Sequence, residues 1–149
     1  MEELLLKMNL MVDILAKKKQ ALNQILDITE NQETILLQPK SDELMVMFNE
    51  MNLEKQEYIQ VVLQADDFFQ NTFKDIKSNF EHNAEKYKDE VRDLQNKIKE
   101  IIDIDVKIRV KEERNKMLLP KFSTNLKIKA PKASKSYMLE QYAKNKNIK

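Results

Sequence analysis

Glycine is absent from all 149 residues of this chain. Two-residue β-hairpins usually need glycine at positions with φ > 0, so a fold rich in hairpins is strongly disfavoured. The phosphate-binding loops of nucleotide enzymes need glycine as well, because their backbone must approach phosphate without an intervening Cβ. The missing residue type therefore predicts an all-α protein and excludes nucleotide sites of the Walker and dinucleotide types.

The residue types that carry most side-chain chemistry are also scarce. The chain has no cysteine and one histidine, His82, which excludes disulfides, zinc knuckles, thiolate nucleophiles and multi-histidine metal sites. We therefore expect a non-enzyme with no catalytic residues, no metal, no cofactor and no small-molecule substrate. Apolar runs fall far short of the ~20 residues that span a bilayer, and the acidic start lacks the basic region of a secretory signal. These features predict a cytoplasmic protein without membrane insertion.

Three prolines, Pro39, Pro120 and Pro131, divide the chain, because proline disrupts a helix interior. Apolar residues recur at helical spacing between them and predict helices over about 3–37, 42–79 and 83–118. Ser41 is a good N-cap for the second helix, and the Ser/Asn/His-rich stretch 78–83 provides a turn before the third. Helices of roughly 35 residues, about 50 Å each, predict an elongated antiparallel three-helix bundle or coiled coil over residues 1–119.

Two stretches leave alternatives open. Residues 102–111 alternate apolar and polar side chains, as do residues 126–130, and together they could form a β-hairpin. We favour a helix for residues 102–111, because an isolated two-stranded ribbon is marginally stable and the apolar face of the third helix continues through them. Lys55 lies on the apolar face of the second helix, and with the run Lys17, Lys18 and Lys19 it could form either a buried polar layer or an exposed ridge.

Charge sets the C-terminal part apart from the bundle. Residues 1–115 carry 17 Lys and Arg against 24 Asp and Glu, net −7, whereas residues 116–149 carry nine lysines against Glu140, net +8. Residues 120–149 are therefore predicted to be a partly disordered basic tail that is mobile when free. Apolar side chains interleaved with the lysines are candidate partner-binding anchors: Met117, Leu118, Phe122, Leu126, Ile128, Tyr137, Met138 and Tyr142.

Other candidate sites have simpler interpretations. Asp66 with Asp67, and Asp103 with Asp105, resemble paired carboxylates, but near neighbours on a helix diverge, so we interpret both pairs as solvated. His82 is expected to cap a helix or to be exposed. Nucleic-acid binding by the tail is a weaker alternative, because lysines without arginine offer no bidentate reading of bases. A second candidate contact surface is the adaptable apolar cluster Met45, Met47 and Met51.

The order of these features is similar to a known family. A leucine-rich first helix passes into Lys17-Lys18-Lys19-Gln20-Ala21-Leu22 and then Ile28-Thr29-Glu30-Asn31-Gln32. Glu54-Lys55-Gln56 follows in the second helix, the third ends with residues 106–115, and the tail contains Tyr142-Ala143-Lys144-Asn145. This arrangement resembles the FlgN-like flagellar type III export chaperones of the clostridial type.

The resemblance implies a chaperone of bacterial flagellum biogenesis. Such a protein binds hook-associated proteins of the hook–filament junction, masks their polymerising terminal helices and delivers them to the export apparatus. It also implies that the C-terminal region engages the cargo, with ordering of the tail coupled to binding. FliT-like chaperones have a similar helical pattern, so the cargo stays open. The alternative from another class is a structural coiled-coil protein that oligomerises.

Overall fold

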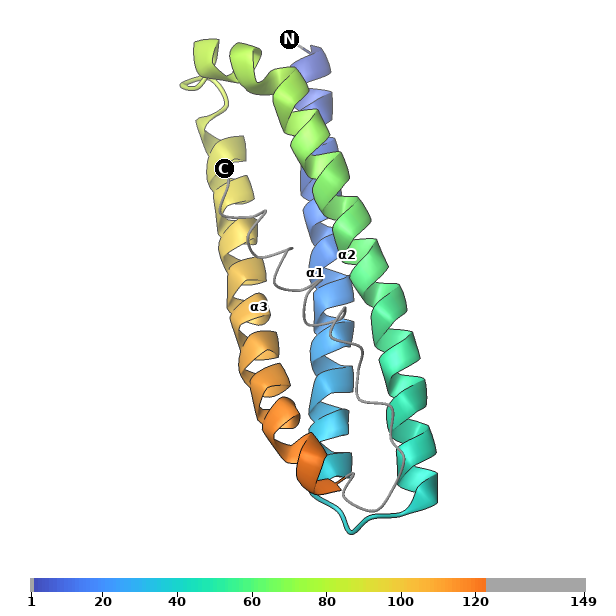
Figure 1. Cartoon of the computed structure of the whole chain (residues 1–149). Coiled ribbons are helices and arrows are strands. Elements are labelled where there is room, and N and C mark those ends of the chain that lie inside the picture. The colour runs from blue at the N-terminus through green and yellow to red at the C-terminus, as the bar shows by residue number, and fades with distance from the viewer. Residues whose placement is uncertain (1, 123–149) are drawn as a thin grey trace.

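The computed structural model describes residues 2–122, which form three long α-helices joined by two short connections. The helices are α1 (Glu2–Leu36), α2 (Asp42–His82) and α3 (Lys88–Phe122). In Figure 1 they run down, up and down, so α2 is antiparallel to both of its neighbours and α3 is parallel to α1. No strand occurs in the part of the chain that the structure describes. The prediction of an elongated all-α three-helix bundle is confirmed.

The connection between α1 and α2 ends in the predicted cap. Ser41 has extended backbone angles, φ −152° and ψ 152°, and its side-chain oxygen accepts a hydrogen bond from the backbone N–H of Leu44 at 3.0 Å. Asp42 and Glu43 add negative charge to the first turn, where the helix dipole favours it. Local sequence is therefore sufficient to start α2.

The turn between α2 and α3 occupies residues 83–87 and shares only Asn83 with the predicted stretch 78–83, because α2 continues three residues beyond its expected end at 79. α2 ends at His82, and the backbone N–H of Asn83 donates to the carbonyl of Phe80. Asn83 has φ −123°, so the helix ends without the left-handed residue that a glycine would usually supply. α3 begins at Lys88, five residues later than the predicted start at 83.

The hairpin alternative is wrong for residues 102–111, which are helical throughout. Ile101 and Ile108, two helical turns apart, are buried in the core, whereas Ile102, Val106 and Val110 are exposed. The alternation thus reflects an α3 with one buried face and a second, exposed apolar stripe. The proposed partner strand, residues 126–130, lies outside the described residues.

The end of the bundle also differs from the prediction. α3 continues through Pro120 to Phe122, so the described bundle extends three residues beyond the expected boundary at 119. Phe122 is 3% exposed and packs in a cluster with Ile35, Leu36 and Phe48. Proline this close to the helix end interrupts few backbone hydrogen bonds, and burial of the phenyl ring offsets that loss.

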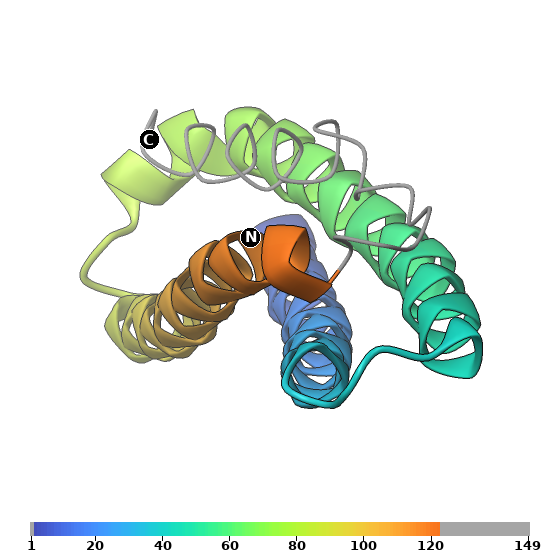
Figure 2. The ribbon, with the colours of Figure 1, turned by 60° about the horizontal axis from the view of Figure 1, so that its bottom comes forward.

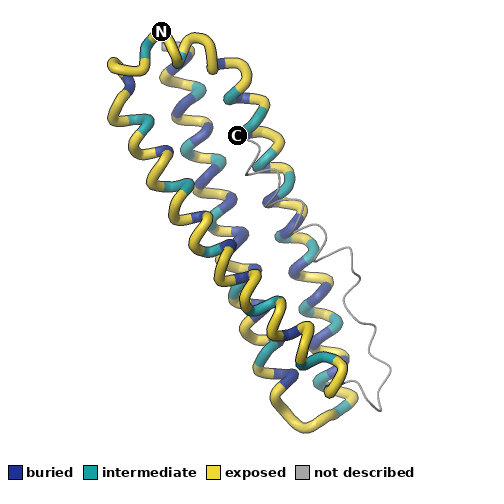
Figure 3. The backbone as a smooth tube through the Cα atoms, turned by 60° about the vertical axis from the view of Figure 1, so that its left-hand side comes forward, coloured by how far each residue is buried: buried dark blue, intermediate teal, exposed yellow. Residues whose placement is uncertain are grey.

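α1 is the central helix of the bundle. It contacts both α2 and α3 along its length, whereas α2 and α3 contact each other far less, and α1 lies between them in both views (Figures 1 and 2). Buried positions follow the inner side of each helix (Figure 3). The larger core cluster includes Leu22, Ile25, Ile59 and Ile108, and the smaller one closes the end where α3 finishes. The bundle is therefore closed around α1 but open between the outer helices.

Candidate functional site

A buried polar layer separates the two apolar clusters. Lys55 of α2 is 3% exposed and forms an ion pair with Glu112 of α3. The hydroxyl of Thr29, from α1, lies 3.3 Å from the same carboxylate and donates to the carbonyl of Ile25 at 2.7 Å. The side-chain amide of Asn115 donates to the carbonyl of Thr29 at 3.0 Å. One layer of hydrogen bonds therefore joins all three helices.

An amide pair extends this layer toward the smaller cluster. Gln32 of α1 donates through Nε2 to Oδ1 of Asn52 on α2 at 2.6 Å, and both residues are buried. Polar groups buried in this way must find partners, since an unmatched amide inside a core is costly. The pairing of Gln32 with Asn52 therefore favours the observed alignment of α1 against α2.

A second buried cation lies further along the core. Lys18 of α1 forms an ion pair with Asp66 of α2, and the carboxylate of Asp105 on α3 is also close enough to favour its charged form. Asp105 is itself buried and pairs with Arg109 at 3.3 Å. The sequence-based view of Asp66 and Asp105 as solvated side chains is wrong, because the two carboxylates converge on Lys18 from different helices.

Burial acts in the same direction on both buried lysines. Desolvation lowers the pKa of Lys18 and the pKa of Lys55 below the ordinary lysine value, and the neighbouring carboxylates partly oppose that shift. Each of these cations is matched by a carboxylate inside the bundle. The three consecutive lysines at residues 17–19 therefore have different environments. Lys18 lies in the core, Lys17 is exposed, and Lys19 forms an ion pair with Glu100 at 2.8 Å. These buried polar groups act as structural contacts between helices.

His82 is exposed at the end of α2, where its Nδ1 lies 2.8 Å from the carbonyl of Ser78, as expected for a terminal residue. Within residues 2–122, no group of three or more His, Asp or Glu side chains is arranged to hold a metal ion. No helix in the same range is long and apolar enough to cross a membrane.

A groove lies between α2 and α3, near the end of the bundle where their connection lies. It has a volume of about 660 Å³, and its apolar lining includes Phe69, Phe73 and Phe80 from α2 and Val91 and Ile98 from α3. Met11 of α1 contributes to the lining as well. The groove follows from the arrangement of the helices, because α2 and α3 both pack on α1 and contact each other far less.

The charged side chains that line this groove are both positive. Among residues 2–122, its charged lining consists of Lys74 and Lys77, accompanied by the amides Gln70 and Gln95. Both lysines are exposed, and neither has a carboxylate partner within the described bundle. A surface with an aromatic interior and positive margins is suited to binding an apolar group that carries negative charge at its edges.

The sequence-predicted anchors do not form one described site. Met117 is 74% exposed, Leu118 packs at the edge of the smaller cluster, and Phe122 is a core residue. Phe122 therefore belongs to the bundle and not to a tail that binds partners. The remaining predicted anchors lie outside the described residues: Leu126, Ile128, Tyr137, Met138 and Tyr142.

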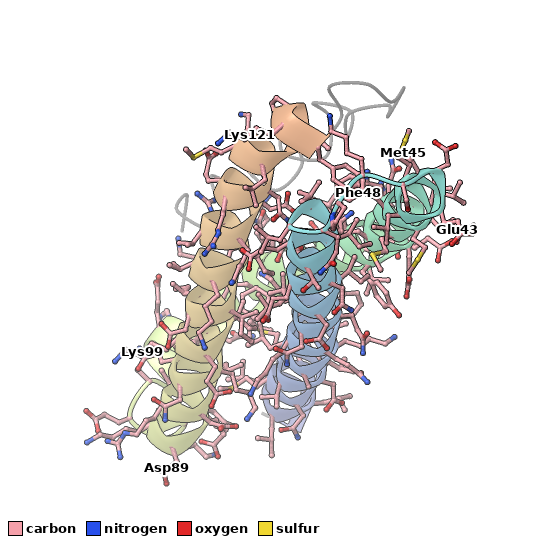
Figure 4. All side chains as sticks on the ribbon, turned by 90° about the horizontal axis from the view of Figure 1, so that it is seen from below. Glu43, Met45, Phe48, Asp89, Lys99 and Lys121 are labelled. Carbon is pink, nitrogen blue, oxygen red and sulfur yellow. The ribbon has the colours of Figure 1, made fainter. Side chains whose placement is uncertain are left out.

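The candidate contact residues Met45, Met47 and Met51 do not form one exposed surface either. Met45 is buried, and Met51 packs against the same cluster, whereas Met47 is exposed. Figure 4 shows Phe48 on the side of α2 that faces α1 and Glu43 on the outer side. The sequence predicted Phe69, Phe73 and Phe80 as a core stripe, and Phe69 is buried in the larger cluster with Phe73 and Phe80 packed against it. The prediction missed the groove that the three side chains also line, although their concentration in one helix end was a visible signal.

The chain combines a three-helix fold with an apolar groove lined mainly by its outer helices, which defines it as an all-α helical bundle. Comparisons with protein-family models, with curated proteins and with solved structures found no match to this chain.

Proposed function

We propose that this chain is a flagellar type III export chaperone of the FlgN-like kind, which acts in the cytoplasm. It would bind the terminal helices of hook-associated proteins, prevent their premature polymerisation and deliver them to the export apparatus. The observation that carries the proposal is the apolar groove between α2 and α3, since a helical bundle open on one side offers a place for a further helix.

The residues behind the family resemblance give separate support. Lys18, Thr29 and Gln32 belong to the α1 segments 17–22 and 28–32 that carry the resemblance. Lys55 belongs to the α2 segment 54–56, and Glu112 to the α3 segment 106–115. These segments are far apart in the sequence, yet Thr29, Lys55 and Glu112 meet in a buried polar layer. Lys18 and Gln32 are buried as well, but they pair with Asp66 and Asn52, which lie outside these segments. The pattern thus specifies helix register and leaves the apolar groove available for recognition.

The proposed mechanism requires binding and release but no bond chemistry. A cargo helix that enters the groove removes apolar surface from water, which favours association. Residues 123–149 would add contacts through Tyr137, Met138 and Tyr142, while their lysines would mainly raise the association rate and its salt dependence. Ordering of the tail on binding would limit the affinity, which suits a cargo that must later be released.

Calorimetry with the full chain and a hook-associated protein tests this function. We expect saturable binding to a fragment that retains the terminal helices, and none to a matched fragment without them. Changing Tyr137 and Tyr142 together to alanine should weaken binding by at least ~2 kcal/mol, the usual hot-spot threshold. Absence of binding to intact hook-associated proteins would contradict the proposed function.

A second candidate function is self-association as a structural coiled-coil protein. The exposed residues Ile102, Val106, Val110 and Met117 recur along one side of α3 at helical spacing. Such a stripe is suited to a contact between helices of two molecules. Sedimentation equilibrium discriminates the two candidates, because this alternative requires a stable oligomer that persists without any flagellar protein.

A further inference from the structure

The apolar lining of the groove between α2 and α3 extends over about the length of a short helix. Its lining on α2 runs from Phe69 to Phe80, a separation of 11 residues that corresponds to about 17 Å, or three helical turns. Val91, Leu94 and Ile98 line the opposite side on α3 at i, i+3 and i+7. Two facing apolar stripes at this spacing are the surface onto which a fourth helix packs in a four-helix bundle.

The margin of the groove selects among possible helices by charge. The charged lining residues within 2–122, Lys74 and Lys77, are separated by about one turn of α2 and project from its exposed side. A helix whose apolar stripe is flanked by carboxylates would place negative charge beside both ammonium groups. A helix flanked by lysines would place like charges together, which opposes binding.

The same charges disfavour the chain's own C-terminal segment as the occupant. Residues 123–149 contain seven lysines and one glutamate, so their net charge of +6 has the same sign as the groove margin. The segment is long enough to reach the groove, since 27 residues extend up to about 90 Å. Its composition, and not its length, therefore argues against it.

We propose that the α2–α3 groove is a docking site for an acidic amphipathic helix of another protein, with Lys74 and Lys77 as the residues that determine charge specificity. This inference deepens the proposed chaperone function and rests on it for the biological partner. It assigns the cargo an apolar face of at least three turns with Asp or Glu along its edges. It also places the contact that selects the cargo by charge on the bundle, in addition to the contacts that Tyr137 and Tyr142 of the tail would make.

The test uses two synthetic helices and the full chain. Both peptides have about 18 residues, long enough to be partly helical, and share one leucine stripe, but one is flanked by glutamates and the other by lysines. Titration should show binding of the glutamate-flanked peptide at least about tenfold tighter than of the lysine-flanked one, with both affinities measured at low salt. Equal binding of the two peptides, or no binding, would overturn the proposal.

Charge reversal at the margin provides the matched variants. Lys74→Glu with Lys77→Glu should weaken binding of the glutamate-flanked peptide about tenfold and should favour the lysine-flanked peptide instead. Lys107→Glu with Lys116→Glu changes the net charge equally at exposed positions outside the groove, so it should retain the original preference. Because all four lysines are exposed, these variants should fold, which circular dichroism verifies. Equal effects of the two pairs would show that net charge, and not the groove, selects the peptide.

The experiments also distinguish other occupants of the groove, and they separate failure of this inference from failure of the proposed chaperone function. If the chain's own tail occupied the groove, the peptide would bind only after removal of residues 123–149; if a second copy did, the protein would be a dimer that excludes the peptide. Either result overturns the inference. A hook-associated protein that binds the Lys74→Glu, Lys77→Glu variant at full strength would overturn it too, while leaving the chaperone function intact. Correct peptide selectivity without any binding of hook-associated proteins would instead contradict only the chaperone function.

Discussion

Lys55 and Glu112 form an ion pair across the interior of the bundle, between α2 and α3, at the level where Thr29 of α1 also reaches the carboxylate. This is a direct link between the two outer helices, which otherwise contact each other little. Charges removed from water lose hydration free energy, and their mutual attraction does not always recover it. We therefore expect the pair to specify how the helices align more than it stabilises them.

The first prediction compares the hydration free energy that Lys55 and Glu112 lose on burial with the attraction between them. Lys55→Met alone should lower the free energy of unfolding by about 3 kcal/mol, because it leaves Glu112 without its cation in a largely buried position. Lys55→Met combined with Glu112→Met should restore the wild-type value or exceed it by about 1–4 kcal/mol. Urea denaturation measures both. A double variant that is less stable than wild type would show that the pair is a net source of stability.

The second prediction is a dependence of stability on pH. Burial lowers the pKa of Lys55 from its ordinary value of 10.5, so between the lowered pKa and 10.5 the unfolded chain binds more protons than the folded one. This group therefore makes the free energy of unfolding rise with pH in that window and leaves it constant below. Relative to the Lys55→Met, Glu112→Met variant, wild type should gain stability as alkaline pH approaches 10.5. A relative loss would mean that attraction to Glu112 outweighs desolvation.

The third prediction separates helix from strand at residues 102–111. Ile108 is completely buried and Val106 is 53% exposed, although a strand would place both on the same face. Ile108→Asp should lower the free energy of unfolding by at least ~3 kcal/mol, because it buries an unpaired carboxylate. Val106→Asp should cost less than ~1 kcal/mol. The stabilities of the two variants are compared by thermal melting, followed by far-ultraviolet circular dichroism at about 222 nm, where helices give their signal. Equal losses of stability would contradict the helical assignment.

The fourth prediction locates the end of the bundle. Phe122→Ala should lower the free energy of unfolding by about 3 kcal/mol, because it leaves a cavity beside Ile35 and Phe48. Met117→Ala, at an exposed position of the same helix, is the control and should change stability by less than ~0.5 kcal/mol. A chain that ends at Phe122 should likewise melt at a higher temperature than one that ends at Leu119. Equal melting temperatures would assign Phe122 to the tail after all.

Several features of the fold followed from local sequence. The absence of glycine and the helical spacing of apolar residues predicted three helices, and Ser41 with Asp42 and Glu43 marked the start of α2. These signals are reliable because caps and turns depend on residues close together in the chain. The Ser/Asn/His-rich stretch likewise indicated the turn near Asn83, which the backbone hydrogen bond to Phe80 completes.

Tertiary structure decided which polar residues are buried and which apolar residues are not. Sequence alone could not distinguish Lys18 from Lys17, since only the approach of Asp66 and Asp105 from other helices supplies partners for a buried ammonium group. It could not reveal the groove either, because Phe73 and Phe80 have the same helical spacing whether a neighbouring helix covers them or not. That difference depends on how α2 and α3 are placed around α1, on which both pack, and this placement is a property of the assembled bundle.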